Sequence, residues 1–391
     1  SSNGLEKRPN LRFPNFDEPW QSTLLSSVFA KNTKKNTDGQ ITNVICNSAK
    51  QGLIPQREYF DKDIANSDNT SGYYIIEEND FVYNPRKSSD APYGPISSYK
   101  YPDAGIVSPL YLCFRAKGAI NPSFYEWYFR SSAWHRYVYM SGDSGARHDR
   151  VSIKDDVFFA MPISIPSARE QEHIASFLDM IDQRIDKQRT LVDNLKKYKR
   201  GVTNAIFNRK LIFSSEDSPY PQWEEKYIGD ICKIQTGKSN TQDETSQGIY
   251  PFYVRSPIVR KSNRYLLDCE AVLTVGDGVG TGKVFHYVQG RFDLHQRVYA
   301  MTDFKMVSGK YFYYYFAHFF YDRVMRMTAK TSVDSVRYEM IDRMTILVPC
   351  KEEQQKIVCF LDRIEKKIKN AEEELNLLEK NKSGFLKQLF I

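Results

Sequence analysis

The sequence lacks the cysteine pairs that would indicate a disulfide framework or a zinc ribbon. Its six cysteines are scattered and form no C-x-x-C motif, so we expect reduced, mostly structural thiols. It also lacks any run near the roughly 20 apolar residues that cross a bilayer, and its N-terminal segment has no apolar signal core. These absences predict a cytoplasmic protein without a membrane-spanning segment.

The residues of the common catalytic motifs are missing as well. The six histidines are scattered, and no cluster of histidine, aspartate or glutamate has the spacing of a metal site. Residues 121–124 (NPSF) differ from the NPPY/F motif of amino-methyltransferases at Ser123. The Pro-Asp pair that ends at Asp103 is not followed by the acid-x-lysine strand of a nuclease. We therefore expect no enzymatic activity and no metal or cofactor bound by this chain.

The glycine-rich segment Gly276–Lys283 (GDGVGTGK) is a poor match to phosphate-binding loops. A Walker A loop needs glycine where Asp277 stands, and Ser or Thr where Val284 follows the lysine. The dinucleotide fingerprint needs a helix next, whereas the following residues, VFHYV, predict a strand. The segment fits a glycine hairpin in which the backbone comes close to a ligand.

What the chain does contain is an internal repeat. The 43 residues from Pro166 align without gaps to those from Pro349, with 14 identical pairs. Ahead of each copy, a short motif ends at Phe13 or Phe213 and is followed by a tryptophan, Trp20 or Trp223. Between these landmarks the copies match only in outline, as in YYIIEENDFVY against YLLDCEAVLTV and NPSFYEWYF against SGKYFYYYF. One framework therefore occurs twice with different contents.

Each copy of the repeated segment is predicted to be a long helix. Apolar residues recur at steps of three and four, which is typical of a coiled-coil seam, and Gln188 is its one polar position. Each copy follows a proline and opens with acidic residues, as helices often do. At 1.5 Å per residue, each helix reaches about 60 Å. The seam residues are Ile174, Leu178, Ile181, Ile185 and Leu195 in the first copy, and Ile357, Leu361, Ile364, Ile368, Leu375 and Leu378 in the second.

The two helices are expected to run antiparallel. The residues between them, if compact, have a radius of gyration of roughly 14 Å, which is much shorter than either helix. The first helix therefore ends, and the second begins, near the same domain. This arrangement gives an antiparallel coiled coil and a pseudo-twofold repeat. The alternative is that each helix packs on the surface of its own domain.

The blocks outside the helices are predicted to be α+β domains. Short β-rich runs, such as AVLTV and KVFHYV, alternate with turn clusters and one aromatic stretch each. The aromatic run from Tyr311 to Tyr321 could stack on bases, but so dense a run is more often a buried helix. We predict two globular mixed α/β domains, residues 1–165 and 211–348, and two long helices, residues 166–210 and 349–391.

Basic, polar loops are the candidate binding surface. A net charge of +7 and a pI near 8.8 permit a nucleic-acid partner without requiring one. Lys and Arg neutralise phosphates, while Arg, Asn and Gln pair with base edges. Any one of these residues is better explained as a solvated surface charge, but together they favour a DNA-binding surface. The candidates in the second block are Lys238, Asn240, Thr241, Arg255, Arg260, Lys261, Lys283, His295, Gln296, Arg297 and Arg337. The weaker candidates in the first block are Lys34, Arg86, Lys87, Arg147, His148 and Arg150.

The layout resembles that of the specificity subunits of type I restriction-modification systems, over essentially the whole chain. It consists of a variable domain, a helix that opens with P-x-x-x-E-Q, a second variable domain and a second such helix. The segments GKSNTQD, YPFYVRSP, AVLTVGDGVGTGKVFHY and HQRVY also look like one recurring class of target-recognition domain.

The resemblance implies a non-catalytic subunit that binds double-stranded DNA. In this family each recognition domain recognises one half of a bipartite sequence, and the paired helices set the gap and dock two methylation subunits. Those subunits bind S-adenosylmethionine, and motor-nuclease subunits complete the restriction complex. Two alternatives stay open: a coiled-coil adaptor that binds proteins and not DNA, and an autonomous methyltransferase.

Overall fold

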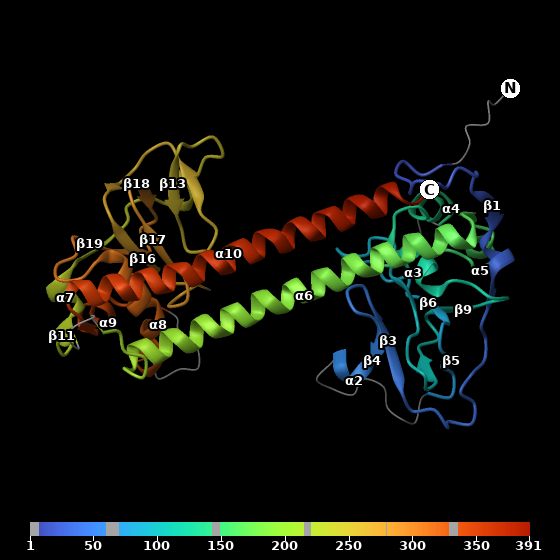
Figure 1. Ribbon diagram of the computed structural model, residues 1–391, viewed down its shortest axis with the longest axis horizontal. Helices are drawn as coiled ribbons and strands as arrows, with labels where there is room; N and C mark the ends of the chain where they lie inside the picture. Colours follow the sequence, from blue (N-terminus) through green and yellow to red (C-terminus); the bar gives the residue numbers. More distant parts are fainter. Residues whose placement is uncertain (1–7, 60–69, 143–148, 215–219, 279, 328–334) are drawn as a thin grey trace. The chain divides into compact units, whose positions relative to one another are not determined.

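The computed structural model describes residues 8–59, 70–142, 149–214, 220–278, 280–327 and 335–391. The chain divides into two compact units. Unit 1 consists of Ser1–Arg189 and Glu374–Ile391, and unit 2 consists of Thr190–Glu373. Each unit thus contains stretches of both long helices, α6 (Ala168–Phe207) and α10 (Lys351–Gln388) (Figure 1). The domain boundaries expected near residues 165, 210 and 348 stay predictions.

Unit 1 is built on short strands. They are β1 (Gln21–Leu24), β2 (Phe29–Lys31), β3 (Val44–Ser48), β4 (Gly52–Pro55), β5 (Tyr74–Ile76), β6 (Phe81–Tyr83), β7 (Ile96–Ser98), β8 (Gly105–Val107), β9 (Leu112–Ala116) and β10 (Pro162–Ile165). Two four-stranded sheets have the orders β2-β9-β6-β7 and β4-β3-β8-β5, and β1 pairs with β10. The β3–β8 pair is parallel, and the other pairs are antiparallel.

Unit 2 repeats this topology strand by strand. Its strands are β11 (Glu224–Tyr227), β12 (Lys233–Thr236), β13 (Tyr250–Tyr253), β14 (Arg260–Ser262), β15 (Leu267–Asp268), β16 (Ala271–Val275), β17 (Phe285–Val288), β18 (Arg291–Leu294), β19 (Val298–Thr302) and β20 (Thr345–Val348). The sheet orders are β12-β19-β16-β17, β14-β13-β18-β15 and β11-β20. The single parallel pair also recurs, as β13–β18. The internal repeat expected from the sequence is confirmed and extends into the blocks that match only in outline.

Further helices complete each unit. Unit 1 has α1 (Leu25–Val28), α2 (Gln56–Tyr59), α3 (Pro122–Arg130), α4 (His135–Ser141) and α5 (Asp155–Phe159). Unit 2 has α7 (Ile228–Ile231), the 3-10 turn η2 (Thr241–Asp243), α8 (Gly309–Met327) and α9 (Tyr338–Asp342). Helix α3 starts where the side chain of Asn121 accepts a hydrogen bond from Phe124 N–H, with Pro122 in the first turn, because proline fits only where no helical N–H is needed.

Aromatic side chains form the core of each unit. In unit 2 the aromatic run lies on α8, where Tyr311, Phe312, Phe316 and Phe320 are fully buried. The rings of Phe316 and Phe320 stack with centroids 4.3 Å apart. The prediction of a buried helix here is confirmed, and burial of each such ring contributes about 1.5–3 kcal/mol. Unit 1 has a similar aromatic core around α3, β6 and β9.

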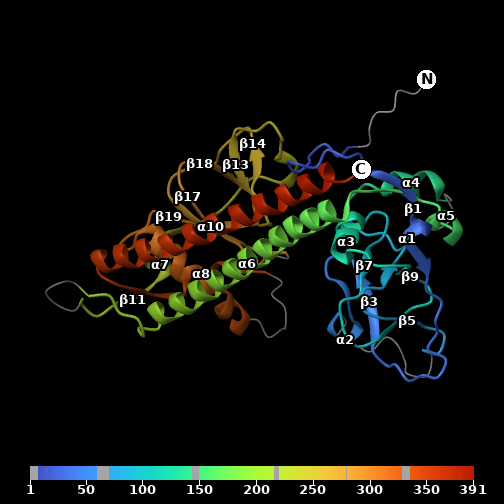
Figure 2. The same ribbon diagram turned by 45° about the vertical axis from the view of Figure 1, so that its right-hand side comes forward.

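The long helices lie antiparallel within each unit (Figures 1 and 2). In unit 2, Lys196 pairs with Glu372 at 2.7 Å, and Lys199 pairs with Glu365 at 2.5 Å. In unit 1, the ring of Phe177 meets that of Phe385 at 5.1 Å, while Arg184 pairs with Glu374 at 3.0 Å. As the number rises along α6, the partner's number falls along α10, which confirms the antiparallel prediction for each unit.

The seam positions divide into two groups. Ile174, Leu178, Ile185, Ile357, Leu361, Ile364 and Ile368 are buried, whereas Ile181, Leu195, Leu375 and Leu378 are half-buried. Several buried members also belong to the core of their own unit. Packing on the domain therefore supplements the coiled coil near the start of each helix. No helix among the described residues has the length and apolar composition to span a membrane.

Candidate nucleic-acid interface

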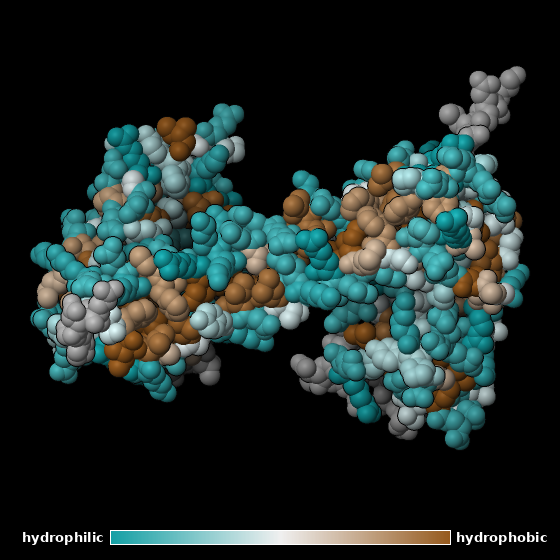
Figure 3. Space-filling view, in the orientation of Figure 1, coloured by the Kyte–Doolittle hydropathy of each residue, from teal (hydrophilic) through white to brown (hydrophobic). Residues whose placement is uncertain are grey.

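Loops distant in the sequence converge on one surface of unit 2. They follow β12, β16 and β18, join β13 to β14, and precede α9. Backbone hydrogen bonds join the loop after β18 to two of its neighbours. Gln296 N–H donates to Ser239 O in the loop after β12 at 2.9 Å, and His295 N–H donates to Tyr253 O at the end of β13 at 3.0 Å. Figure 3 shows that the face around β13 and β18 is mostly hydrophilic. The result is a polar surface assembled from separate loops.

Glycines permit the closest crossings between these loops. Gly276 N–H donates to Arg297 O, and Val336 N–H donates to Gly276 O, both at 2.7 Å. A Cβ atom on Gly276 would lie 2.8 Å from Arg297 O, and one on Gly237 would lie 2.1 Å from Leu294 O, which is too close for any side chain. The segment after β16 connects the two strands of the antiparallel β16–β17 hairpin, so the expected hairpin is confirmed, while the approach of its backbone to a ligand stays a prediction.

Two arginines share one carboxylate at this crossing. Asp277 Oδ1 lies 3.4 Å from Arg255 Nη1, and Asp277 Oδ2 lies 3.7 Å from Arg297 Nε. The arginine side chains are 48% and 62% exposed, while that of Asp277 is 23% exposed. Each guanidinium has five N–H donors, so a single carboxylate at these distances leaves most of their capacity open to a ligand. Sequence reasoning selected both arginines but passed over Asp277.

His295 is a buried residue that contacts the backbone of this cluster. It is 4% exposed, and its Nδ1 accepts a hydrogen bond from Arg297 N–H at 3.1 Å. Burial lowers the pKa of His295, as do the nearby positive charges of Arg255 and Arg297, although Asp277 opposes them. The neutral ring therefore acts as an acceptor that fixes the turn carrying Arg297.

The remaining candidates of unit 2 occupy varied environments. The ammonium of Lys283 lies 5.0 Å from the ring centroid of Tyr321 on α8. Arg260 pairs with Glu244 at 3.0 Å, and Arg337 is an exposed residue at the start of α9. The other candidates are exposed loop, turn or edge-strand residues: Lys238, Asn240, Thr241, Lys261 and Gln296. Their contacts with DNA stay predictions.

A buried acid beneath the loops was not anticipated. Asp293 on β18 is 1% exposed, and its oxygens accept hydrogen bonds from Ser239 Oγ at 2.7 Å and Ser262 Oγ at 3.0 Å. Arg264 donates to Ser239 Oγ at 3.0 Å and to Asp243 at 2.7 Å. These bonds fasten the loop after β12 to β18. The basic character of the segment was evident in the sequence, but the pairing was not.

Unit 1 has arginines at the corresponding crossing. Val151 N–H donates to Pro85 O at 2.9 Å, as Val336 does to Gly276 in unit 2. The next residue, Arg86, forms an isolated antiparallel bridge with Arg150, whereas in unit 2 the bridge joins Asp277 to Ser335. The structure thus brings together two of the candidates from the first block. Arg147 and His148 lie outside the described residues.

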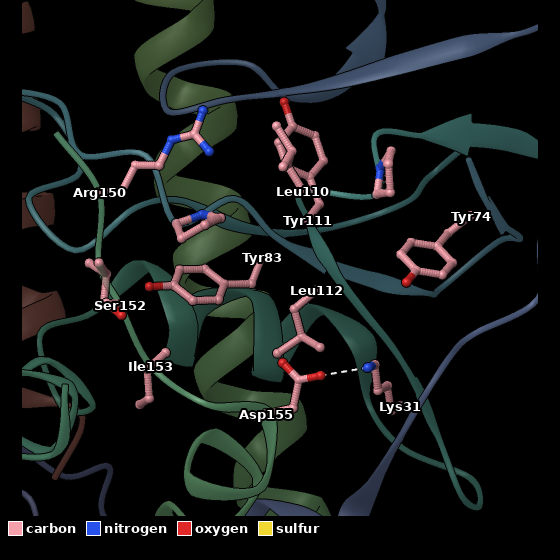
Figure 4. A pocket seen from close by; sticks show the side chains of 13 residues that line it. Lys31, Tyr74, Tyr83, Leu110, Tyr111, Leu112, Arg150, Ser152, Ile153 and Asp155 are labelled. Atoms are coloured by element: carbon pink, nitrogen blue, oxygen red, sulfur yellow. Dashed lines mark hydrogen bonds and ion pairs between the residues drawn. The ribbon is translucent and has the colours of Figure 1, made fainter. Parts of the chain in front are cut away.

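Two adjoining cavities flank this arginine pair. One has a volume of about 780 Å³, and its mostly uncharged lining contains the basic residues Lys50, Arg86, Lys87 and Arg150 and the acidic residue Asp90. The other, of about 460 Å³, has Arg150 and Tyr111 toward one end and the ion pair of Lys31 and Asp155, at 2.5 Å, at the other (Figure 4).

Lys34, the remaining described candidate of unit 1, pairs at the surface with Glu77 at 3.4 Å. Among the residues with a described position, no group of three or more His, Cys, Asp or Glu side chains could hold a metal ion.

The chain is a duplicated protein: two α+β units of one topology, each with an antiparallel helix pair and arginine-bearing loops. Residues 220–380 match the family model described as the type I restriction modification DNA specificity domain. Over those residues the chain is similar to this domain family, and the predicted resemblance to type I specificity subunits is confirmed.

Relatives of known class support the same assignment. The chain is 23% identical over 153 residues to the type I restriction enzyme EcoDI specificity subunit from Escherichia coli. That alignment covers 39% of this chain and 33% of the relative. It is 22% identical over 271 residues to the type I restriction enzyme MjaIX specificity subunit from Methanocaldococcus jannaschii, and that alignment covers 61% of this chain and 61% of the relative. The chain therefore spans about a third to three fifths of the length of the curated relatives it matches.

Solved structures share the fold across nearly the whole chain. A type I restriction-modification S subunit from M. genitalium superposes with a TM-score of 0.62 at 14% identity, covering 98% of this chain and 99% of that one. The HsdS subunit from Thermoanaerobacter tengcongensis superposes with a TM-score of 0.52 at 16% identity, covering 97% and 98%. At these identities the likeness establishes the fold.

Proposed function

We propose that this chain selects the DNA sequence for a type I restriction-modification complex and is not itself an enzyme. Each unit recognises one half of a bipartite target in double-stranded DNA. The paired helices set the gap between the halves and dock two methylation subunits. Those subunits bind S-adenosylmethionine, and motor-nuclease subunits join them for restriction.

The observation that carries this proposal is the arginine surface of unit 2. Arg255 and Arg297 come from different loops, lie on one carboxylate and are about half exposed. Arginine pairs with the O6 and N7 atoms of guanine through two parallel hydrogen bonds, and loops held by backbone bonds reduce the cost of ordering it. This surface falls inside the matched family domain, residues 220–380.

Alanine substitutions of the two arginines test the assignment. Arg255→Ala or Arg297→Ala should weaken binding of the target duplex by about 1–3 kcal/mol if the arginine pairs with guanine. Arg291→Ala is the matched control, because Arg291 is an exposed arginine paired with Asp268 at 2.9 Å at the other end of β18. Parental affinity in both variants would show that these loops do not face DNA.

Salt dependence separates this proposal from the adaptor alternative. A chain that neutralises several phosphates has an affinity that falls steeply and log-linearly with salt concentration, by a slope of about 0.9 per phosphate contact. An adaptor that binds proteins gives no duplex binding at any salt concentration. The measurement is fluorescence anisotropy of a labelled duplex with the full chain alone, because the methylation subunits act on DNA themselves.

The absence of enzymatic activity has its own test. The purified chain alone should neither transfer methyl groups to duplex DNA nor bind S-adenosylmethionine in a calorimetric titration. Added methylation subunits should restore methylation at one bipartite motif. Methyl transfer by the chain alone would establish the autonomous methyltransferase instead.

A further inference from the structure

The position of Asp277 is at odds with a surface that binds a polyanion. It places a carboxylate between the two arginines that are proposed to contact DNA. Its oxygens lie 3.4 Å and 3.7 Å from the guanidinium nitrogens, whereas a strong charge-assisted hydrogen bond measures about 2.7–2.9 Å. The acid therefore attracts both arginines without saturating either.

Backbone contacts fix the position of Asp277. Its neighbour Gly276 is bonded to Arg297 O on one side and to Val336 N–H on the other, and Asp277 itself bridges to Ser335. Its side chain is mostly covered, while the two arginine side chains extend from loops. A carboxylate fixed between two long, exposed side chains limits where their guanidinium groups can lie.

The repeat shows what stands at this position in the other unit. The bridge between Arg86 and Arg150 corresponds to the bridge between Asp277 and Ser335. In unit 1 the two bridged residues are both arginines. In unit 2 one bridged residue is an acid, Asp277, which lies near two arginines from neighbouring loops. Both units present a pair of guanidinium groups at the same place in the topology, by different means.

We propose that Asp277 is a positioning residue for DNA recognition by unit 2. It holds Arg255 and Arg297 in the orientation in which they pair with base edges, and it keeps them from the nearest phosphates. The inference rests on the proposed function and adds to it a device for sequence discrimination. Without the carboxylate, each arginine is free to turn toward phosphates, which all sequences share.

The isosteric variant Asp277→Asn distinguishes an effect on the preference for the target sequence from an effect on the overall affinity for DNA. Removal of one negative charge should steepen the log-log dependence of affinity on salt by up to about 0.9 and tighten binding to unrelated duplexes. Preference for the target over an unrelated duplex should fall about tenfold, which is the scale of one lost arginine–guanine pair. Asp277→Glu, which keeps the charge, should restore most of the preference.

The experiment uses the complex of this chain with its methylation subunits, in cells and in vitro. Methylome sequencing of cells with the parent identifies the target motif. With Asp277→Asn, the half-sequence recognised by unit 2 should become degenerate while the other half is unchanged. Asp268→Asn is the matched control, because Asp268 also pairs with an arginine, Arg291, but lies roughly 13 Å along β18 from the cluster. Thermal unfolding should show that all variants remain folded.

The possible outcomes distinguish failure of the proposed function from failure of the positioning role of Asp277. A parent complex that methylates no bipartite motif overturns the proposed function. A parent with a bipartite motif that Asp277→Asn leaves unchanged, with the same salt slope, overturns the positioning role alone. Equal loss of preference in Asp277→Asn and Asp277→Glu would also overturn it, because the charge would then be irrelevant.

Discussion

The internal repeat supplies two tryptophans at matched positions with different hydrogen bonding. Both are buried, Trp20 to 4% and Trp223 to 9% exposure. Trp223 Nε1 donates to Glu353 Oε2 at 2.7 Å. Trp20 Nε1 has no hydrogen-bond partner in the described part of the chain, because Glu170 accepts instead from Arg12 Nε and Nη2, both at 2.8 Å. Replacement of each tryptophan by phenylalanine should therefore have unequal costs.

The difference follows from one hydrogen bond. Trp20→Phe and Trp223→Phe remove the same atoms from similarly buried sites, so the packing losses are comparable. Trp223→Phe also removes a donor from a carboxylate that is 1% exposed, which costs about 1.5–3 kcal/mol. Arg209, 4.5 Å from the ring centroid of Trp223, loses part of its cation–π attraction. We expect Trp223→Phe to cost about 2 kcal/mol more than Trp20→Phe, or roughly 30-fold in the opening equilibrium.

Hydrogen exchange measured by mass spectrometry resolves the two units. Amides of β20 and the first turns of α10 report on Trp223→Phe, and those of β10 and the first turns of α6 report on Trp20→Phe. The control is Trp223→Phe in a Glu353→Gln background, where the acceptor that loses the indole is neutral, so the cost measured against Glu353→Gln alone should fall toward that of Trp20→Phe. That reference also cancels the loss of the ion pair of Glu353 with Arg209, whose atoms lie 3.3 Å apart in the parent. Equal costs for the two single variants, or a larger one for Trp20→Phe, would refute this reasoning.

Three further predictions concern the seam, pH and helix length. Leu361→Ala should destabilise unit 2 by about 2–5 kcal/mol in urea denaturation, since it leaves a cavity, whereas Leu377→Ala, at an exposed site, should cost under about 0.5 kcal/mol. Burial lowers the pKa of four histidines below the ordinary 6.5: His135, His286, His295 and His318. The unfolded chain then binds more protons than the folded chain, so the free energy of unfolding should fall as pH drops below about 6.5, and urea midpoints that stay constant from pH 7.5 to 5.5 would contradict this. Insertion of four residues after Lys196 adds about 6 Å, so methylome sequencing should find both half-sequences kept and the gap longer by one or two base pairs of about 3.4 Å; an active variant with the parental gap would exclude the helices as the spacer.

Local patterns in the sequence were sufficient for much of the architecture. The spacing of residues such as Leu178 and Leu361 predicted both long helices, because a helical period is a property of neighbouring residues. The dense aromatic run from Tyr311 predicted a buried helix for the same reason. The short motif ahead of each copy of the repeat also matched Trp20 with Trp223, so a shared topology was expected before any strand pairing was known.

The candidate site depended on tertiary structure to a greater degree. Arg255 and Arg297 were selected from the sequence because of their residue type and their polar, loop-like surroundings. Their shared carboxylate, Asp277, was seen only as a mismatch to a phosphate-binding loop. Its proposed role depends on the backbone bonds of Gly276 with Arg297 and Val336. The local sequence of any one of these segments does not predict that the three come into contact.

The sequence by itself determined the duplication, the two helices, their antiparallel course and the basic character of the loops, because periodicity, charge and self-similarity can be seen along the chain. Only the tertiary structure decided which loops meet, that Asp277 stands where unit 1 has Arg86, and that His295 is buried beneath the arginines. The physical reason is that these contacts join residues tens of positions apart, and the path of the backbone through the sheets sets their distances.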